Sequence, residues 1–475
     1  MESATNKYKN IFDVLLIFYN NIIIKNRRIM SIFERRQNNF EIIVREFMCF
    51  FQENDCHKLF EENRQNLIDK ISEMKDVDGE LYEFALVTAI NNTFGNYEDA
   101  YKLDYEDETD GELVVQCEML NSEETVNIGK VYYKGEESIF TRFLSKCNFP
   151  RSDDEISYSI DSFIDKLIIM RELETETRIQ YNRLTSEITL DRIAKLENSI
   201  TVALVPFVGS KDYLNIKEEG IKFTINIKNN KENFTHIKDI MDELSKRGVN
   251  VVIFPEMTFT LEIKRELQKY LRKNKNPFEL IVSGSVWENK TNKCYILNNK
   301  GQVLLEQVKV YPFLHRPDPK MKIKGNGEGI NMNGEDAIIN IIDINKFGRV
   351  ATPICVDFVN EEYYNKLAVG GVNVALNPVC TGSLTKFDLN AKQLGTKNKA
   401  TVFISNTCIF RSNENIGFIY VPIKLDDKAM PINSSELMYK RRNECSDCTR
   451  ECINKICAKI VKFSNNACVT EEIIL

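Results

Sequence analysis

Histidine is scarce in this chain, since its 475 residues include only His57, His236 and His315. A metal centre held by several histidines is therefore nearly excluded, because such centres need two or more imidazole ligands. A hydrolase that pairs a cysteine with a histidine would have to use one of these three side chains. The scarcity of histidine thus limits both metal binding and the activation of a thiol by imidazole.

The chain also lacks an excess of positive charge and a long apolar run. Its formal net charge is −7, so we expect no nucleic-acid partner bound through bulk charge. The most apolar N-terminal run, 11–24, is interrupted by Asp13, Asn20 and Asn21 and is too short to span a bilayer. It has no basic start and no small-residue cleavage site, so we expect no signal peptide, no membrane association and a cytoplasmic location.

Length and composition indicate a globular protein with more than one domain. Hydrophobic residues make up 43% of the chain and charged residues 28%, which is typical of soluble proteins. A chain of 475 residues exceeds one ordinary hydrophobic core, so we expect at least two domains. Thirteen cysteines without a secretion signal are expected to be mostly reduced thiols.

Residues 1–195 predict a mostly helical accessory domain of unknown role. Apolar residues recur at helical spacing over 41–75 and 81–90, and charged helical patterning continues over 161–192. Segments 113–119 and 126–133 are typical of a strand pair. No motif that carries chemistry occurs here, and a charged helical surface most often serves as scaffold or partner surface.

From residue 199 the pattern changes to strands that alternate with helices. Apolar runs typical of buried strands occupy 200–207, 249–254 and 280–286, and amphipathic helical segments separate them. The segments 293–310 and 337–354 each predict a hairpin. Residues 199–475 therefore predict an α/β domain built in layers.

Three chemically reactive side chains lie at the ends of predicted strands: Glu256, Lys309 and Cys355. Each has a purely structural explanation, namely a strand-end cap, an outward position in an alternating strand, and a buried core cysteine. Cys355 follows an apolar run and precedes a helix-compatible segment, so we expect the helix dipole to lower the pKa of its thiol. Because open α/β sheets place their sites at strand ends, the three together predict one active site.

The stretches around these residues resemble the nitrilase superfamily of carbon–nitrogen hydrolases. The resemblance covers the Phe-Pro-Glu ending of 249–256, the approach to Lys309, and the Ile-Cys-x-Asp pattern in 348–357; it extends to the strands at 200–207 and 370–378. It implies a four-layer α-β-β-α sandwich over 199–475 that forms a homodimer or larger assembly. It implies no cofactor for catalysis.

The resemblance also implies roles for the site residues. Cys355 is the nucleophile that forms a thioester with an amide, nitrile or carbamoyl carbon. Glu256 is the general base, with a pKa that burial should raise. Lys309 and the backbone N–H of Val356 stabilise the oxyanion. Family members carry a second glutamate after the lysine, for which Glu328 is our prediction; Glu335 and Asp318 are alternatives.

A cysteine-rich insertion at 445–457 has no counterpart in the family. Cys445, Cys448, Cys452 and Cys457 fall within 13 residues, at a spacing that matches no standard metal motif. Zinc, an iron–sulfur cluster, a redox-active disulfide set and plain reduced thiols are all compatible with this run.

The function predicted from the sequence is hydrolysis, or acyl transfer, at a non-peptide carbon–nitrogen bond of a small molecule. Two other classes stay open. One is a catalytically idle nitrilase-like scaffold whose helical region binds a partner. The other is a sensor whose C-terminal cysteines report metal or redox state.

Overall fold

The computed structural model describes most of the chain in two compact units. The first unit comprises residues 1–110, 118–135 and 150–174, and the second comprises 111–117, 136–149 and 175–475. Segments that precede residue 199 therefore contribute to both units. The described residues are 10–54, 56, 61–95, 113–117, 129–133, 137–145, 163–164, 166–171, 177–207, 214–219, 222–228, 231–314, 327–330, 337–409, 415–422, 438–440, 457–464 and 467–474.

The first unit is mostly helical, as the sequence predicts. Among its described residues, the helices and an antiparallel strand pair are α1 (Ile11–Ile24), α2 (Asn26–Arg35), α3 (Gln37–Glu53), α4 (Glu61–Val77), α5 (Tyr82–Phe94), β2 (Gly129–Tyr133) and β3 (Leu167–Arg171). Helix α1 begins with a capping box, in which the Asn10 side chain accepts from the N–H of Asp13 and the Asp13 side chain accepts from the N–H of Asn10. Within the described residues, no helix of either unit is both long and apolar enough to cross a bilayer.

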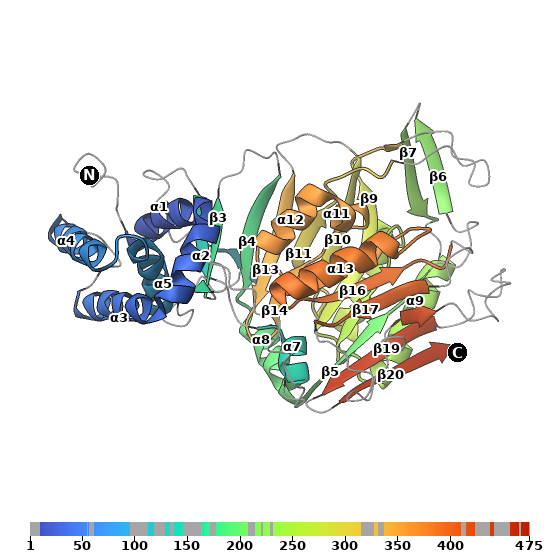
Figure 1. The fold of residues 1–475 in the computed structure, drawn as a ribbon. Helices are drawn as coiled ribbons and strands as arrows, with labels where there is room; N and C mark the ends of the chain where they lie inside the picture. The colour runs from blue at the N-terminus through green and yellow to red at the C-terminus, as the bar shows by residue number, and fades with distance from the viewer. Residues whose placement is uncertain are drawn as a thin grey trace. The chain divides into compact units, whose positions relative to one another are not determined.

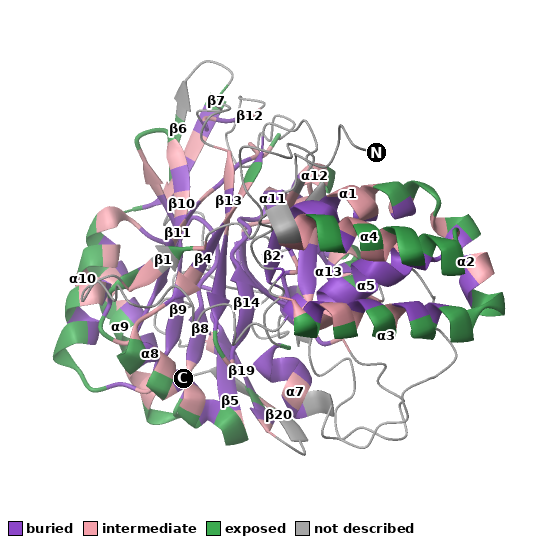
Figure 2. Cartoon of the chain, turned by 90° about the vertical axis from the view of Figure 1, so that its left-hand side faces the viewer, coloured by how far each residue is buried: buried purple, intermediate pink, exposed green. Residues whose placement is uncertain are grey.

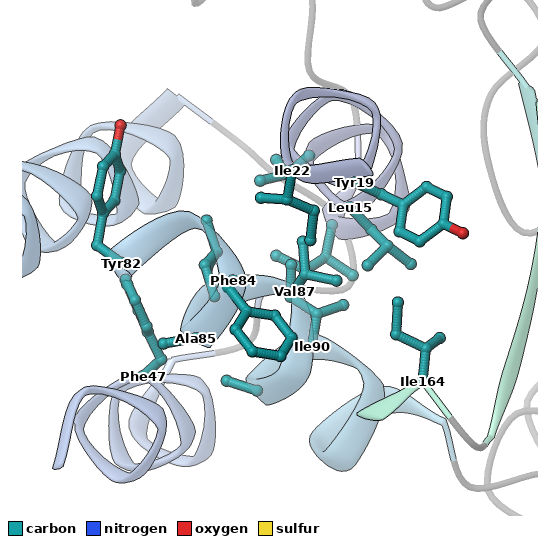
Figure 3. Close-up of a cluster of buried hydrophobic side chains, with 14 of the residues drawn as sticks. Leu15, Tyr19, Ile22, Phe47, Tyr82, Phe84, Ala85, Val87, Ile90 and Ile164 are labelled. Atoms are coloured by element: carbon teal, nitrogen blue, oxygen red, sulfur yellow. The ribbon is translucent and has the colours of Figure 1, made fainter. Parts of the chain in front are cut away.

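Helix α5 forms the centre of the first unit. It is buried on nearly every face, as expected of a helix that is apolar all round. Figure 3 shows its side chains, among them Val87 and Ile90, gathered between those of α1 and Phe47 of α3. Most of this core comes from helical side chains, and Val131 and Tyr133 of β2 and Leu167 of β3 complete it.

Two expectations for the N-terminal half are wrong. The strand at 114–116, β1 (Val114–Gln116), does not pair with β2; it pairs with β4 (Arg178–Leu184). Residues 167–171 and 178–184 are strands and not helix. Strand β4 runs parallel to β13 (Ile338–Ile344), and such non-local pairing overrides the local pattern from which the helix was predicted.

The second unit contains two large sheets. The strand order of the first sheet is β1-β4-β13-β14-β15-β16-β17-β18. Its last five strands are β14 (Gly348–Ala351), β15 (Val374–Val379), β16 (Thr401–Asn406), β17 (Asn415–Tyr420) and β18 (Met438–Lys440). The order of the second is β11-β10-β9-β8-β5-β19-β20, with β11 (Val303–Val308), β10 (Thr291–Leu297), β9 (Leu280–Glu288), β8 (Val251–Ile253), β5 (Ser199–Leu204), β19 (Cys457–Ser464) and β20 (Ala467–Ile474). Both predicted hairpins are confirmed, as β10–β11 and β13–β14.

The two sheets pack face to face, with β15 against β8 and β9 and β16 against β5. Helices α9 (Lys231–Lys246) and α10 (Leu261–Lys273) cover the outer face of the seven-stranded sheet (Figure 2), and α12 (Glu361–Val369) and α13 (Thr385–Asn398) cover the outer face of the eight-stranded sheet (Figure 1). Figure 2 shows the inner strands buried while α9 and α10 keep one face exposed. The predicted four-layer α-β-β-α sandwich is confirmed.

Smaller elements complete the second unit. They are α7 (Ile139–Ser145), α8 (Glu187–Ala194), a 3-10 turn at Lys195–Asn198, and α11 (Val356–Val359). A third sheet has the order β12-β7-β6, formed by β12 (Gly327–Glu328), β7 (Lys222–Ile227) and β6 (Leu214–Glu219). This small sheet matters for the site, because β12 carries Glu328.

Candidate active site

Glu256, Lys309 and Glu328 form a buried ionic cluster. Glu256 follows β8 and Lys309 follows β11, so both lie at the carboxyl ends of strands of the same sheet. The Lys309 Nζ is 2.6 Å from Glu256 Oε1 and 2.6 Å from Glu328 Oε2. All three residues are at most 2% exposed. An ammonium shared by two buried carboxylates is costly to desolvate, which is typical of a functional site.

Cys355 lies at the turn between β14 and α11, as predicted. Its φ is 50° and its ψ is −110°, which is a rare conformation for a residue with a side chain. The turn is held by the N–H of Cys355, which donates to Pro378 O at 3.0 Å and lies 3.3 Å from Asn377 Oδ1. A strained strand-to-helix turn of this kind costs about 1–3 kcal/mol and displays a nucleophile in other hydrolase folds.

The expected low pKa of the Cys355 thiol is wrong. Burial raises the pKa of Cys355 well above its ordinary value, and the nearby Glu256 carboxylate raises it further, while Lys309 lowers it. Helix α11 has only four residues, so its dipole is small against the cost of desolvating a thiolate. The resting group is therefore a thiol.

Glu256 lies close enough to Cys355 to influence the protonation of the thiol. Burial raises the pKa of Glu256, as predicted; Lys309 lowers it, and Glu328 raises it. Burial alone would lower the pKa of Lys309, but the attraction of the two carboxylates outweighs burial and leaves that pKa well above its usual range. Lys309 is thus a fixed cation beside a proton acceptor and a thiol.

Asn292 belongs to the same cluster and was missed at the sequence level. Its Nδ2 is 3.1 Å from Glu256 Oε1 and 3.1 Å from Glu328 Oε1, and its backbone oxygen accepts from the N–H of Lys309 at 2.8 Å. The predicted strand began at Lys293 and so left Asn292 outside. The signal available was a lone amide at the start of a strand that leads to the lysine.

Glu328 is the predicted second carboxylate that the structure brings to Lys309. The backbone N–H of Phe313 donates to Glu328 Oε2 at 2.9 Å, which fixes the side chain in place. The alternatives Glu335 and Asp318 lie outside the described residues.

Asp357, within the Cys-x-Asp pattern, connects the turn at Cys355 to the segment that follows β11 and contains Lys309. Its carboxylate accepts from the N–H of Tyr311 at 2.8 Å and from the N–H of Val310 at 3.1 Å. Burial raises the pKa of Asp357 to about 7, against the lowering effects of Lys309 and these two N–H groups. Asp357 therefore holds the segment that follows Lys309 against the turn that presents Cys355.

Two other predicted groups have a less defined position. Val356 is the first residue of α11, so its N–H has no partner within the helix, and its oxyanion role stays a prediction. Cys445, Cys448 and Cys452 lie outside the described residues, and Cys457 is a half-buried residue at the start of β19. In the part of the chain that the structure describes, no group of three or more metal-ligating side chains occurs. The metal site at 445–457 stays a prediction.

Alkylation of Cys355 by iodoacetamide should be slow at neutral pH and should accelerate as pH rises. The variants Glu256→Gln and Lys309→Met should shift this profile in opposite directions, since Glu256 raises the pKa of Cys355 and Lys309 lowers it. We expect half-maximal alkylation at lower pH for Glu256→Gln and at higher pH for Lys309→Met, measured by peptide mass spectrometry at Cys355. Identical profiles in both variants would mean that the three residues do not interact.

The layers and strand order of the second unit define a nitrilase-like α-β-β-α fold. No family model and no curated protein matches the sequence. Similar solved structures include Saccharomyces cerevisiae Nit3, a member of branch 10 of the nitrilase superfamily, with 17% identity over 47% of this chain and 83% of that chain and a TM-score of 0.31.

Two further structures are similar to this chain. The C. elegans NitFhit protein is 14% identical over 47% of this chain and 56% of that chain, with a TM-score of 0.33. An amidase from Nesterenkonia sp. is 14% identical over 47% of this chain and 83% of that chain, with a TM-score of 0.35. The strand order of this chain defines its fold. The low identities and TM-scores of these structures carry no conclusion about its activity.

Proposed function

We propose that this protein cleaves a non-peptide carbon–nitrogen bond of a small molecule through a thioester on Cys355. The single observation that carries the proposal is the buried Lys309, which bridges Glu256 and Glu328 beside a thiol held in a strained turn. An amide, nitrile or carbamoyl group supplies the electrophilic carbon.

In the first half-reaction Glu256 accepts the Cys355 proton while the sulfur attacks the substrate carbon. Lys309 and the Val356 N–H stabilise the negative charge that develops on the substrate oxygen or nitrogen. For an amide, the protonated Glu256 then gives its proton to the leaving amine, and a thioester remains. This proton route fits a resting thiol beside Glu256, whose Oε2 is buried and accepts no hydrogen bond within the described residues.

In the second half-reaction Glu256 takes a proton from water, and the hydroxide attacks the thioester. The C–S bond then breaks, the acid leaves, and the proton held by Glu256 returns to the Cys355 sulfur. An acceptor nucleophile in place of water would make the protein an acyl transferase. Asn292 and Glu328 act as positioning residues. Asn292 donates a hydrogen bond directly to Glu256, and Glu328 holds Asn292 by accepting a second hydrogen bond from the same amide. No cofactor is needed for these steps.

Two other interpretations are weaker. An idle scaffold has no use for three buried charged groups, whose desolvation costs several kcal/mol each. A metal or redox sensor would rest on Cys445, Cys448, Cys452 and Cys457 and would leave the Glu256–Lys309 cluster unexplained. A homodimer or larger assembly and a cytoplasmic location complete the proposal.

The test is a screen of amides, nitriles and ureido compounds with the Glu256→Gln variant, followed by intact-mass measurement. This variant keeps the side-chain volume but cannot activate water, so a slowly formed thioester should persist and add the mass of the acyl group. The double variant Glu256→Gln, Cys355→Ser is the control and should gain no mass. A screen without turnover by the parent protein and without an adduct would contradict the proposal.

A further inference from the structure

A pocket separate from the ionic cluster lies beside the small β12-β7-β6 sheet of the second unit. It has a volume of about 240 Å³ and opens between the β6–β7 hairpin, the β9–β10 turn and the end of β12. Its polar lining includes Lys217, Lys222, Lys290, Glu288 and Trp287. A volume below the roughly 300–1,000 Å³ of drug-sized sites suits a small ligand.

The pocket is cationic. Lys217 lies on β6, Lys222 starts β7, and Lys290 lies in the β9–β10 turn, so three separate elements each contribute a lysine to the lining. Across the described residues, no carboxylate forms an ion pair with any of these three lysines. Three lysines against the single carboxylate of Glu288 leave the lining with a net positive charge, and an anion between the lysines reduces their mutual repulsion.

Two polar atoms of lining residues also have no partner. The Trp287 Nε1 and the Asn226 Oδ1 are both shielded from solvent and form no hydrogen bond within the described part of the chain. Buried donors such as an indole N–H are usually satisfied, so an unsatisfied donor in a pocket wall is a second indication of a ligand.

We propose that this Lys217–Trp287 pocket binds a small anion that carries a phosphate or carboxylate group. Lys217, Lys222 and Lys290 supply the positive charge, and such charge-assisted contacts are the strong ones for these groups. The anion is either a part of the substrate or a separate small molecule.

The walls of this pocket are next to the ionic cluster. Gly329, which lines the pocket, directly follows Glu328, and its N–H donates to Phe223 O at 2.8 Å. Trp287 is the cross-strand partner of Asn292 in the β9–β10 hairpin. A bound anion therefore contacts the immediate neighbours of two residues that hold Glu256 and Lys309.

Trp287 makes the proposal directly measurable, because it is the only tryptophan in the chain. Intrinsic fluorescence, excited at the indole band, therefore reports this pocket and nothing else in the protein. The full-length protein would be titrated with inorganic phosphate and, separately, with succinate, each against sodium chloride at matched ionic strength. We expect a saturable change in fluorescence with at least one of the two probes and none with chloride.

The variants Lys217→Gln, Lys222→Gln and the pair together should weaken the apparent affinity, with a loss of at least tenfold for the pair. Lys397→Gln on α13 is the matched control, since it removes an exposed lysine far along the chain from the pocket, and it should leave the midpoint unchanged. The absence of a saturable change with both probes, or equal weakening by Lys397→Gln, would overturn the proposal.

Activity measurements then separate the two sources of the anion. If the anion is part of the substrate, Lys222→Gln should raise KM for a carboxylated amide and leave a neutral amide unaffected. If it is a separate molecule, phosphate should change turnover of the neutral amide in the parent and not in Lys222→Gln. The fluorescence titration measures binding and requires no turnover. It therefore tests the anion site even if the protein proves to have no hydrolase activity.

Discussion

Replacing Cys355 with serine should reduce kcat/KM by roughly 10⁴-fold or more, the scale seen when a hydrolase loses its nucleophile. Serine keeps the shape of the side chain, but its hydroxyl is a far weaker nucleophile at neutral pH than cysteine. The measurement is turnover of whichever substrate the screen identifies, together with the thermal unfolding midpoint. Since the side chain is 4% exposed and close in volume, the midpoint should change little.

Two other thiols serve as controls for this variant. Cys49 is exposed on α3 in the first unit, and Cys49→Ser should leave turnover unchanged. Cys380 is half-buried and its backbone oxygen is 4.0 Å from the Cys355 sulfur, so Cys380→Ser tests whether a neighbouring thiol can substitute for the nucleophile. A Cys355→Ser protein that turned over at the parent rate would remove Cys355 from the mechanism.

The largest effect on stability is expected from Lys309→Met. This substitution leaves two buried carboxylates, Glu256 and Glu328, without their shared cation, and removal of one partner of a buried ion pair typically costs about 3–5 kcal/mol. Turnover should also fall, by roughly 10²–10³-fold, because an oxyanion donor is lost. Urea unfolding measures the first effect. The exposed pair Lys392–Asp388 gives the control Lys392→Met, with an expected change within about 0.5 kcal/mol.

The stability deficit of Lys309→Met should grow with pH. Burial raises the pKa of Glu256 above the value of about 4.3 in an unfolded chain, and Lys309 is the cause that most opposes the rise. Without Lys309 the folded protein holds the Glu256 proton to still higher pH. Stability then falls as pH rises from the unfolded pKa through the folded one, because the unfolded state releases that proton more readily. Equal deficits at pH 5 and pH 8 would contradict this account.

The site could be predicted from sequence where each residue ends an apolar run. Each of Glu256, Lys309 and Cys355 follows a strand that its apolar residues reveal. Glu256 and Lys309 lie at strand ends of one sheet, and Cys355 lies at a strand end of the sheet packed against it. Glu328 was one of three choices, because β12 is only two residues long and has no pattern to find. Asn292 gave no signal beyond its type, since an asparagine near a hairpin usually serves the turn.

The pKa of Cys355 shows a different limit of sequence-based prediction. The thiol was expected to ionise easily because a helix follows it, which is a local argument. Its actual environment is set by Glu256, which lies about a hundred positions earlier, and by complete burial. Burial is a property of the packed sheets, so no window of sequence contains it.

The fold was predictable from residue 199 onward because strands β5, β8 and β9 are rich in apolar residues and almost entirely buried. The earlier strands were not, because β4 carries charged residues and pairs with a strand more than 150 positions later. Periodicity reports the burial of a face. It does not show which strand lies next to that face in the sheet, so the prediction wrongly paired β1 with β2.

The entry of β1 and β4 into the eight-stranded sheet bears on how this protein can be dissected. A truncation at residue 199, where the composition changes, would delete both strands and leave β13 as a bare edge. That edge would present a row of unpaired N–H and C=O groups on a strand rich in isoleucine, which is a template for aggregation. The second unit is therefore separable from the helical unit only by a cut that keeps residues 111–117, 136–149 and 175–198, and these segments are separated in the chain by β2 and β3 of the other unit. Each unit is built from several segments that alternate along the chain, so no single cut in the sequence separates the two units.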